Sequence, residues 1–213
     1  MNTVLILIIV VNLLVSFKGF GDEHFFGKYE FHIGSIRAGE HVRMITSAFL
    51  HADLGHLFFN MFTLYMFAPV VIQYFDNFSF LSIYAGSLVF GSLLTLLFHK
   101  DDYSYRAIGA SGAVTGILYS AILLQPDMSL YLFFIPIPIP AYLFGIGYLL
   151  YSIYGMKAKN DNIGHTAHFG GAIGGYLLTI IKEPQMITDN SFMVVLLAIP
   201  IVILFVLAKA GKL

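Results

Sequence analysis

The chain has 213 residues, of which 58% are hydrophobic and only 11% are charged. An average soluble domain has roughly 25% charged residues, so this composition is typical of a protein that crosses a membrane several times. The net charge of −1 and the lack of any basic run argue against nucleic acid as a partner. The absence of cysteine excludes disulfides and thiol nucleophiles.

Seven apolar segments predict transmembrane helices, at residues 3–17, 56–75, 79–98, 108–125, 138–156, 164–182 and 191–209. Most of them approach the roughly 20 residues that a helix needs to cross a bilayer. No Lys or Arg precedes the first segment and no small-residue cleavage site follows it, so we expect a retained helix instead of a signal peptide. The sequence therefore predicts an all-α membrane protein.

The connections between these segments are short, with one exception. Residues 18–50 are rich in aromatic and polar side chains, which suits either a structure in the headgroup region or a small extramembrane cap. A proline stretch that ends at Pro140 separates the fourth and fifth segments and resists helix formation. Because no internal repeat is visible, we expect one compact membrane domain.

The fourth segment opens with Gly109-Ala110-Ser111-Gly112-Ala113. The start of a helix offers free backbone N–H groups and a partial positive charge, both of which stabilise an oxyanion next to a serine nucleophile. Gly112 and Gly116 also form a GxxxG pair, which by itself favours simple helix packing. Taken alone, the run therefore favours packing over catalysis.

A histidine enters the sixth segment above a face of glycines. His168, Gly171 and Gly175 share one side of the predicted helix, so this helix can pack closely against a partner. The imidazole can then act as general base for a serine on that partner. The alternative is a structural hydrogen bond between helices. We expect His165, one turn earlier, at the membrane interface without a catalytic role.

The second segment carries two neutral donors on one face, His56 and Asn60. In an apolar environment they can hydrogen-bond a developing negative charge. Asp53 and Gly55 are expected to begin this helix, with His51 near the interface.

A zinc site is an alternative, since His51, His56, His165 and His168 could in principle be ligands. The sequence has no HExxH motif and no carboxylate at a useful spacing, so we expect no metal. A transporter is disfavoured as well, because all twelve carboxylates fall in connections or at segment ends. A catalytically idle membrane protein that binds other helices is a further alternative, which the presence of both Ser111 and His168 argues against.

Three stretches together resemble the rhomboid intramembrane serine proteases. They are EHVRMITSAFLHADLGHLFFN at 40–60, GASGAVTG at 109–116 and AHFGGAIGG at 167–175. The resemblance covers residues 3 to 182 and implies a six-helix transmembrane core over residues 1–182, with residues 18–50 as an interfacial first loop. Residues 183–213 would then form a connection and one additional C-terminal transmembrane helix.

The resemblance also implies the roles of individual residues. Ser111 would be the nucleophile and His168 the general base of a dyad, while His56, Asn60 and the backbone N–H of Ser111 would form the oxyanion hole. Close helix packing at the site is expected from a set of glycines: Gly109, Gly112, Gly171 and Gly175. The implied activity needs no cofactor and hydrolyses peptide bonds in or near transmembrane segments of membrane-protein substrates. We expect a multi-pass protein of the cell membrane.

Two positions depart from the family pattern. Many members have a Trp-Arg pair in the first loop, where this chain has Val42-Arg43 and no tryptophan at all. Some members also have a tyrosine against the histidine ring, four residues after the nucleophile, where this chain has Thr115. Either His168 is oriented differently, or Tyr119 or another ring takes that place.

Two indications of the orientation in the membrane, the family resemblance and the positive-inside rule, conflict. The resemblance implies a cytoplasmic amino terminus, which would leave Lys182 as the basic residue on the inner side. The other ten basic residues would lie outside, against the positive-inside rule: Lys18, Lys28, Arg37, Arg43, Lys100, Arg106, Lys157, Lys159, Lys209 and Lys212. We expect the family orientation, because part of this charge belongs to the long first loop.

Overall fold

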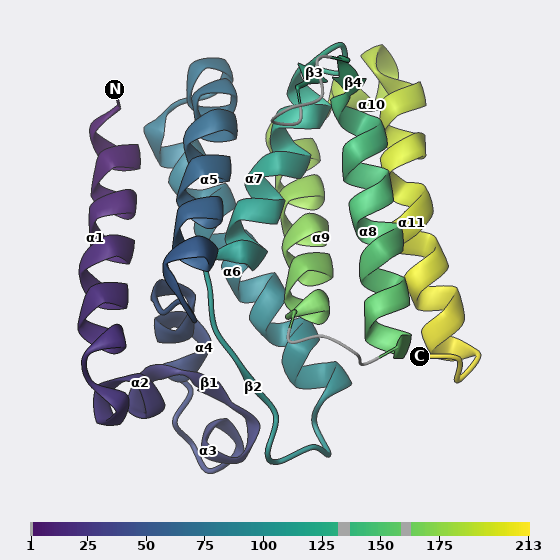
Figure 1. The fold of residues 1–213 in the computed structure, drawn as a ribbon. Helices are drawn as coiled ribbons and strands as arrows, with labels where there is room; N and C mark the ends of the chain where they lie inside the picture. The colour runs from purple at the N-terminus through teal and green to yellow at the C-terminus, as the bar shows by residue number, and fades with distance from the viewer. Residues whose placement is uncertain (1, 132–136, 159–162) are drawn as a thin grey trace.

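The computed structural model describes residues 2–131, 137–158 and 163–213 (Figure 1). Lys159, one of the basic residues named above, and Pro136 of the proline stretch before Pro140 lie outside these ranges. The described residues form a bundle of long helices, which confirms the predicted all-α class. The long helices are α1 (Thr3–Phe20), α5 (Leu54–Tyr74), α6 (Asn77–Phe98), α7 (Ser111–Leu124), α8 (Ala141–Ala158), α9 (His165–Lys182) and α11 (Ser191–Lys209).

Successive long helices run in alternate directions, and the two chain ends lie at opposite ends of the bundle (Figure 1). Four of them, α1, α5, α6 and α11, are long and apolar enough to cross a membrane. Helix α9 is different, because most of its residues are buried inside the bundle.

Acidic side chains begin two of the spanning helices. The Asp53 carboxylate accepts a hydrogen bond from the His56 backbone N–H at 2.8 Å, so α5 begins at Leu54, two residues before the predicted segment. Asp76 accepts in the same way from the Ser79 N–H at 2.6 Å and begins α6. Both are N-caps, which provide an acceptor for a free helix-terminal N–H.

Helix α7 is shorter than the other long helices and begins inside the bundle. It has 14 residues and starts at Ser111, three residues later than the predicted segment. At 1.5 Å per residue it covers about 21 Å, whereas the hydrocarbon core of a bilayer is about 30 Å thick. All its residues after Ser111 are buried. The start of this helix is therefore placed within the bundle and not at its end (Figure 1).

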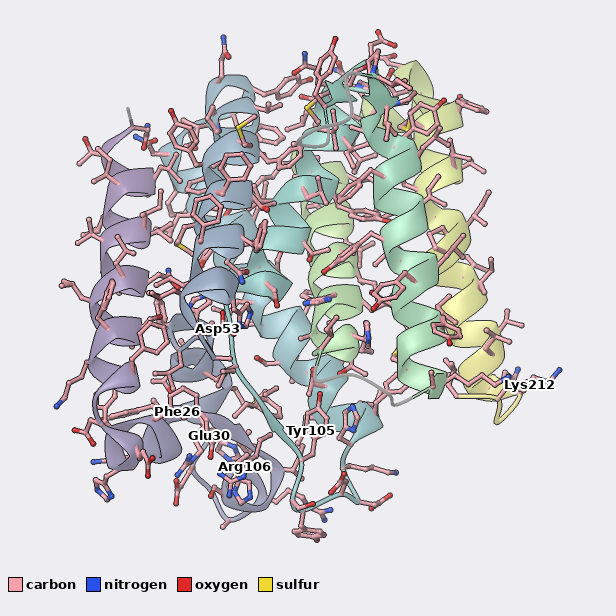
Figure 2. All side chains as sticks on the ribbon, in the orientation of Figure 1. Phe26, Glu30, Asp53, Tyr105, Arg106 and Lys212 are labelled. Atoms are coloured by element: carbon pink, nitrogen blue, oxygen red, sulfur yellow. The ribbon has the colours of Figure 1, made fainter. Side chains whose placement is uncertain are left out.

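The first connection is a folded cap at one end of the bundle. It contains α2 (Glu23–Tyr29), β1 (Phe31–His32), α3 (Ile33–Arg37), α4 (Arg43–Thr46) and the 3₁₀ turn η1 (Ser47–Phe49). Figure 2 places Phe26, Glu30, Tyr105 and Arg106 together at this end. We refer to this assembly, residues 22–49, as the cap.

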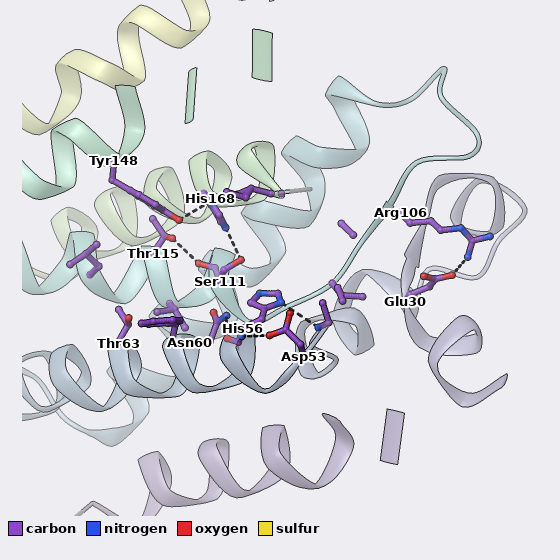
Figure 3. A pocket seen from close by; sticks show the side chains of 18 of the residues that line it. Glu30, Asp53, His56, Asn60, Thr63, Arg106, Ser111, Thr115, Tyr148 and His168 are labelled. Atoms are coloured by element: carbon purple, nitrogen blue, oxygen red, sulfur yellow. Dashed lines mark hydrogen bonds and ion pairs between the residues drawn. The ribbon is translucent and has the colours of Figure 1, made fainter. Parts of the chain in front are cut away.

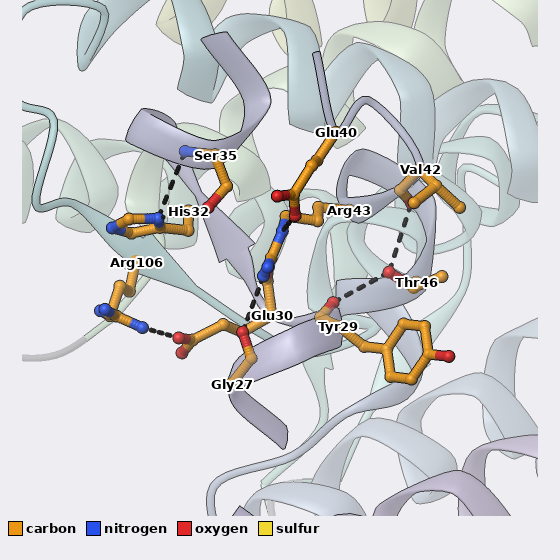
Figure 4. Close-up of polar contacts among 10 residues, drawn as sticks. All are labelled: Gly27, Tyr29, Glu30, His32, Ser35, Glu40, Val42, Arg43, Thr46 and Arg106. Carbon is orange, nitrogen blue, oxygen red and sulfur yellow. Dashed lines mark hydrogen bonds and ion pairs between the residues drawn. The ribbon is translucent and has the colours of Figure 1, made fainter. Parts of the chain in front are cut away.

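Arg43 holds the cap together without any tryptophan (Figure 4). Its buried guanidinium donates to the Gly27 and Glu30 carbonyl oxygens at 2.7 and 3.1 Å and pairs with the Glu40 carboxylate at 2.6 Å. The neighbouring Val42 side chain is 60% exposed and contributes little. Arg43 thus anchors the cap, while Val42 is a surface residue.

Strand β1 of the cap pairs with β2 (Arg106–Ala107), the segment that leads to α7. The pairing is antiparallel, with Phe31 opposite Ala107 and His32 opposite Arg106. An ion pair between Arg106 and the buried Glu30 carboxylate reinforces it (Figure 4). The cap therefore fixes the chain just before the helix that carries Ser111.

The other end of the bundle has a second two-residue pairing, β3 (Ser129–Leu130) with β4 (Ile139–Pro140). Helix α8 begins directly after Pro140, which confirms that the proline stretch resists helix formation, although the apolar segment was placed from residue 138. Short helix α10 (Met186–Asp189) leads into α11. Helix α11 is tied to α9 by the Tyr176 hydroxyl, which donates to the Val194 carbonyl at 2.9 Å.

Candidate active site

A cavity of about 900 Å³ lies between α5, α7, α8, α9 and the cap (Figure 3). Its lining combines aromatic rings with a group of polar side chains, among them Glu30, Asp53, His56, Asn60, Ser111 and His168. The cavity extends from Arg106 at the cap to Leu118, two turns into α7. Polar groups thus line a path from one end of the bundle to the start of α7.

Ser111 and His168 meet on the wall of this cavity. Ser111 is the first residue of α7 and His168 lies in the first turn of α9, and the Ser111 Oγ is 2.7 Å from His168 Nε2. The imidazole is 5% exposed, while Ser111 is half-buried and reaches the cavity. This geometry allows a proton to pass directly from the hydroxyl to the ring.

Glycines let α7 and α9 approach closely enough for this contact. A Cβ added to Gly171 would collide with the Gly112 carbonyl, and one added to Gly175 would collide with the Gly116 carbonyl. A Cβ on Gly112 itself would lie 3.0 Å from the Ala167 carbonyl oxygen. Helix packing with small residues at the contact is what brings Ser111 within reach of the histidine.

Gly109 is not part of that helix contact. It lies in the turn before α7, with a φ of 110°, which is a backbone conformation that favours glycine. A Cβ at this position would lie 2.7 Å from both Cε1 and Nε2 of His56. Gly109 therefore differs from the helix-packing role that we expected, and it leaves room for the His56 ring beside Ser111.

His56 and Asn60 lie on the α5 face that borders the cavity (Figure 3). The Ala52 N–H donates to His56 Nδ1 at 3.4 Å, so a neutral His56 carries its proton on Nε2, the nitrogen that faces Gly109. The Asn60 side-chain amide donates one hydrogen to the His56 carbonyl at 2.9 Å, and its second hydrogen remains for another acceptor.

The N-terminus of α7 supplies further donors. Its N-cap is Ala110, whose side chain cannot accept a hydrogen bond from the first turn. The first N–H groups of a helix have no partner within the helix, and the helix dipole is positive there. An anion next to Ser111 would therefore meet the Ser111 N–H and the two donors from α5.

The second ring nitrogen of His168 has a partner that we did not foresee. The Tyr148 hydroxyl of α8 is 2.8 Å from His168 Nδ1, and the two rings stack with centroids 5.4 Å apart and an interplanar angle of 29°. Tyr119, the ring that we named as a substitute, lies elsewhere and donates to the Gly145 carbonyl at 2.9 Å. Thr115 donates to the Ser111 carbonyl at 2.7 Å.

The sequence allowed a substitute ring to be expected but did not identify it as Tyr148. The departure at Thr115 left a substitute ring as one of two alternatives, but helix α8 has four tyrosines: Tyr142, Tyr148, Tyr151 and Tyr154. Their spacing does not distinguish the one that faces α9.

His51 is fully buried in the protein. The Ser16 hydroxyl donates to the Phe49 carbonyl at 2.9 Å, so the Ser16 oxygen accepts from His51 Nδ1–H at 2.8 Å. His51 Nε2 in turn accepts from the Ala110 N–H at 3.5 Å. Burial, followed by the nearby His56, lowers the pKa of His51 to about 3.

His165 is also buried, at 4% exposure. Its ring packs edge-on against Tyr151 and against His168, with centroids 5.4 and 6.2 Å away, respectively. Within the described parts of the chain, no three histidine or acidic side chains are grouped closely enough to hold a metal ion.

Comparisons with known proteins point to a single family. A family model described as the Rhomboid domain matches residues 38–185. The chain is 31% identical over 175 residues to the Arabidopsis thaliana RHOMBOID-like protein 12, mitochondrial, which is 75% of this chain and 52% of the relative. It is 33% identical over 154 residues to the putative rhomboid protease YdcA of Bacillus subtilis, covering 68% of this chain and 69% of the relative.

A yeast relative, Rhomboid protein 1, mitochondrial, from Saccharomyces cerevisiae, is 30% identical over 139 residues. The match spans 64% of this chain and 40% of the yeast protein. The chain thus spans about half or less of its plant and yeast relatives and about two thirds of the bacterial one.

Proposed function

The chain belongs to the rhomboid family, and from this premise we propose that it is an intramembrane serine endopeptidase that uses a Ser111–His168 dyad. The observation that carries the proposal is the 2.7 Å contact between Ser111 Oγ and His168 Nε2 on the wall of a polar cavity. The family match and the apolar helices make the chain a multi-pass membrane protein.

The first half of the reaction forms an acyl-enzyme. Ser111 Oγ attacks the carbonyl carbon of the scissile peptide bond, while His168 Nε2 takes the hydroxyl proton. The tetrahedral intermediate collapses as the C–N bond breaks, and His168 returns that proton to the amine that leaves. Because one histidine serves as base and then as acid, no other titratable group is needed in this step.

The negative oxygen of the intermediate requires donors that are already in place. The Ser111 N–H at the start of α7, His56 Nε2–H and the Asn60 side-chain amide all border the same part of the cavity. In a site with little water such donors stabilise a transition state more strongly than they would in bulk solvent. We assign these three groups to the oxyanion hole.

The second half of the reaction consumes water. A water molecule in the cavity attacks the acyl carbon, His168 takes its proton, and the bond to Ser111 breaks to release the carboxylic acid product. The polar lining between the cap and Ser111 gives water a path to a site at the start of a buried helix.

The substrates that fit this site are membrane proteins, cut in or near a transmembrane segment. The site lies inside a bundle of membrane-spanning helices, so a peptide bond reaches it from the bilayer or from its edge. We assign the proteolytic unit to residues 1–182 and treat the helix in residues 183–213 as an addition to it. The proposed location is the cell membrane, although two of the relatives are named as mitochondrial proteins.

The test is cleavage of a single-span model substrate by the purified full chain in liposomes, beside Ser111→Ala and His168→Ala. Each variant should lower the rate by about three orders of magnitude, because members of a catalytic unit are each indispensable. Ser104→Ala and His41→Ala, both at exposed positions, are the matched controls and should keep the full rate.

A fluorophosphonate probe gives an answer that does not depend on the choice of substrate. Labelling of the wild type and both controls, with none of Ser111→Ala and very little of His168→Ala, is the expected result. Equal cleavage and equal labelling by all five proteins would contradict the dyad, and so would an unlabelled wild type.

A further inference from the structure

The chain segment that leads into α7 is held by the cap at successive points. The Ile33 N–H donates to the Tyr105 carbonyl at 3.1 Å, and β1 pairs with β2 over the next two residues. Further along, the Gly109 N–H donates to the Ser47 carbonyl at 3.0 Å. Every partner in this series belongs to the cap, so the cap sets the path of the backbone into Ser111.

One contact between side chains joins the two strands of this pairing. The Glu30 carboxylate, from the residue before β1, forms an ion pair with Arg106, the first residue of β2 (Figure 4). The Glu30 side chain is only 7% exposed, whereas that of Arg106 is 56% exposed. An ion pair with one buried member is screened less than a fully exposed pair, so it restrains the two strands more strongly.

Glu30 is itself fixed from the other side. Its backbone carbonyl accepts from the buried Arg43 guanidinium at 3.1 Å, and this guanidinium pairs with the Glu40 carboxylate at 2.6 Å. A series of charged contacts thus runs from the anchor of the cap through Glu30 to Arg106, five residues before Ser111. Figure 3 shows the Glu30–Arg106 pair at one end of the cavity and Ser111 further along it.

The path of this segment matters for the chemistry, because the proposed oxyanion hole includes the backbone N–H of Ser111. A backbone donor cannot be reoriented by side-chain rotation, so its direction follows from the residues that precede it. Gly109, two residues earlier, has a φ of 110° and is hydrogen-bonded to the cap. A displacement of about 1 Å at a reacting group lowers a rate by about 100-fold.

We propose that Glu30 and Arg106 are positioning residues, which set the Ser111 N–H and hydroxyl in place for the transition state. The inference rests on the proposed function and deepens it. The ion pair acts through the backbone of residues 106–110 and not by contact with the reacting atoms. It therefore contributes to the rate of the chemical step and not to the affinity for the substrate.

The two members of the pair differ in what their loss leaves behind. Without Arg106, the buried Glu30 carboxylate loses this cation, and an uncompensated buried charge is strongly unfavourable. Without the Glu30 charge, the Arg106 guanidinium can be hydrated, because more than half of its side chain is exposed. Arg106→Gln should therefore be the more damaging single change. The double variant, in which neither charge remains, should resemble Glu30→Gln.

The test measures cleavage of a single-span model substrate by full-chain variants in liposomes. Glu30→Gln should lower kcat by about 10-fold and Arg106→Gln by about 10- to 100-fold, as expected for a displaced oxyanion donor. Arg106→Lys keeps a cation beside the carboxylate and should recover most of the rate. Thermal unfolding is followed for each variant, so that all rates are measured well below the unfolding transition.

Arg37→Gln is the matched control. Arg37 pairs with Asp101 at 4.0 Å and so also connects the cap to the loop after α6, but both side chains are exposed. This variant should keep kcat within about twofold of the wild type. Substrate affinity is measured separately in the Ser111→Ala background, where adding Glu30→Gln should leave the Kd unchanged within about twofold.

The Ser111 amide gives a readout that needs no turnover. Its signal in the ¹H–¹⁵N spectrum of serine-labelled protein is assigned by its loss in Ser111→Ala. Glu30→Gln and Arg106→Gln should both move this signal, because the backbone before it is released from the cap. Arg106→Lys and Arg37→Gln should leave the signal near its wild-type position.

Two results would overturn the inference. One is an unchanged kcat together with an unchanged Ser111 amide signal in Glu30→Gln and Arg106→Gln. The other is a weaker substrate affinity in Glu30→Gln at unchanged kcat, which would make the pair a substrate contact. A wild type that is inactive and unlabelled at Ser111 would instead contradict the proposed function, and the amide spectrum would still decide whether the ion pair positions Ser111.

Discussion

At the scale of single residues, His51 links three parts of the chain that surround the nucleophile. It is fully buried, donates to Ser16 of α1 and accepts from the N–H of Ala110, the residue before Ser111. The bond from Ala110 requires the neutral ring, because a protonated Nε2 would face another donor. The integrity of this corner of the site therefore depends on the protonation state of His51.

The first prediction concerns the dependence of stability on pH. The pKa of His51 is lowered to about 3 in the folded protein, against 6.5 for an unperturbed histidine. Between these values the unfolded chain binds a proton at this position and the folded chain does not. Stability should therefore be full above pH 6.5 and fall as the pH is lowered, by at most about 1.4 kcal/mol per pH unit.

The measurement is the thermal unfolding of detergent-solubilised protein at pH 7 and pH 4.5. His51→Asn should unfold at a lower temperature at pH 7 but lose less on acidification than the wild type does. His41→Asn, at an exposed position, is the control and should keep the full acid-dependent loss. If His51→Asn and the wild type lose the same amount, His51 is not the group responsible.

The candidate catalytic residues could be predicted from the sequence, but the side chain that contacts the second ring nitrogen of His168 could not. Ser111, His168, His56 and Asn60 stand in local motifs, and the structure brings all four to one cavity. Tyr148 does not stand in a motif, because which of the four α8 tyrosines meets the histidine depends on the rotation of α8 against α9. That rotation is a property of tertiary packing and leaves no local pattern.

At the scale of elements, the contact between α7 and α9 determines whether a dyad can exist. Gly171 and Gly175 face the carbonyls of Gly112 and Gly116 across the two helices, with no space for a methyl group. The separation of the helix axes here is therefore set by the glycines themselves, and a shift of one helix is transmitted to the distance between Ser111 and His168.

The second prediction is that Gly171→Ala disrupts the site. The added methyl must displace backbone, so unfolding should become easier by about 1–3 kcal/mol. Labelling of Ser111 by a fluorophosphonate should fall more than stability alone explains, since the helices move apart at the dyad. Gly147→Ala in α8 is the matched control, with no atom within 4 Å of its added Cβ. A labelling rate for Gly171→Ala equal to that of Gly147→Ala would contradict this account.

The order of the helices and the approximate extent of the spans followed from the sequence, whereas the internal structure of the cap did not. Apolar runs of 15 to 20 residues give a strong signal. The pairing of β1 with β2 involves two residues on each side, which is too short for any alternation of polar and apolar residues to be read. The late start of α7 depends on the turn at Gly109, which hydrophobicity does not reveal.

At the scale of the whole molecule, the cavity reaches the end of the bundle that carries the cap (Figure 2). The side of the membrane that this end faces is therefore the side from which water enters. Most of the basic residues also lie in or near this end, which is the reason why the positive-inside rule and the family orientation disagree.

The third prediction tests this orientation. The chain has no cysteine, so Glu40→Cys in the cap and Gln185→Cys at the opposite end each introduce one thiol at an exposed position. In intact cells a membrane-impermeant maleimide should label position 40, and it should reach position 185 only after permeabilisation. The reverse pattern would mean that the cap is cytoplasmic and that the positive-inside rule holds.

The separation of Ser111 and His168 by 57 positions, with the whole of α8 between them, has a consequence for biosynthesis. At about 5–20 residues per second, a ribosome needs about 3 to 11 s to add the residues that separate the two. During this interval the new chain has the proposed nucleophile without its proposed base. On the proposed mechanism each new molecule is thus inert during its insertion, and it becomes competent only after α9 has entered between its neighbours.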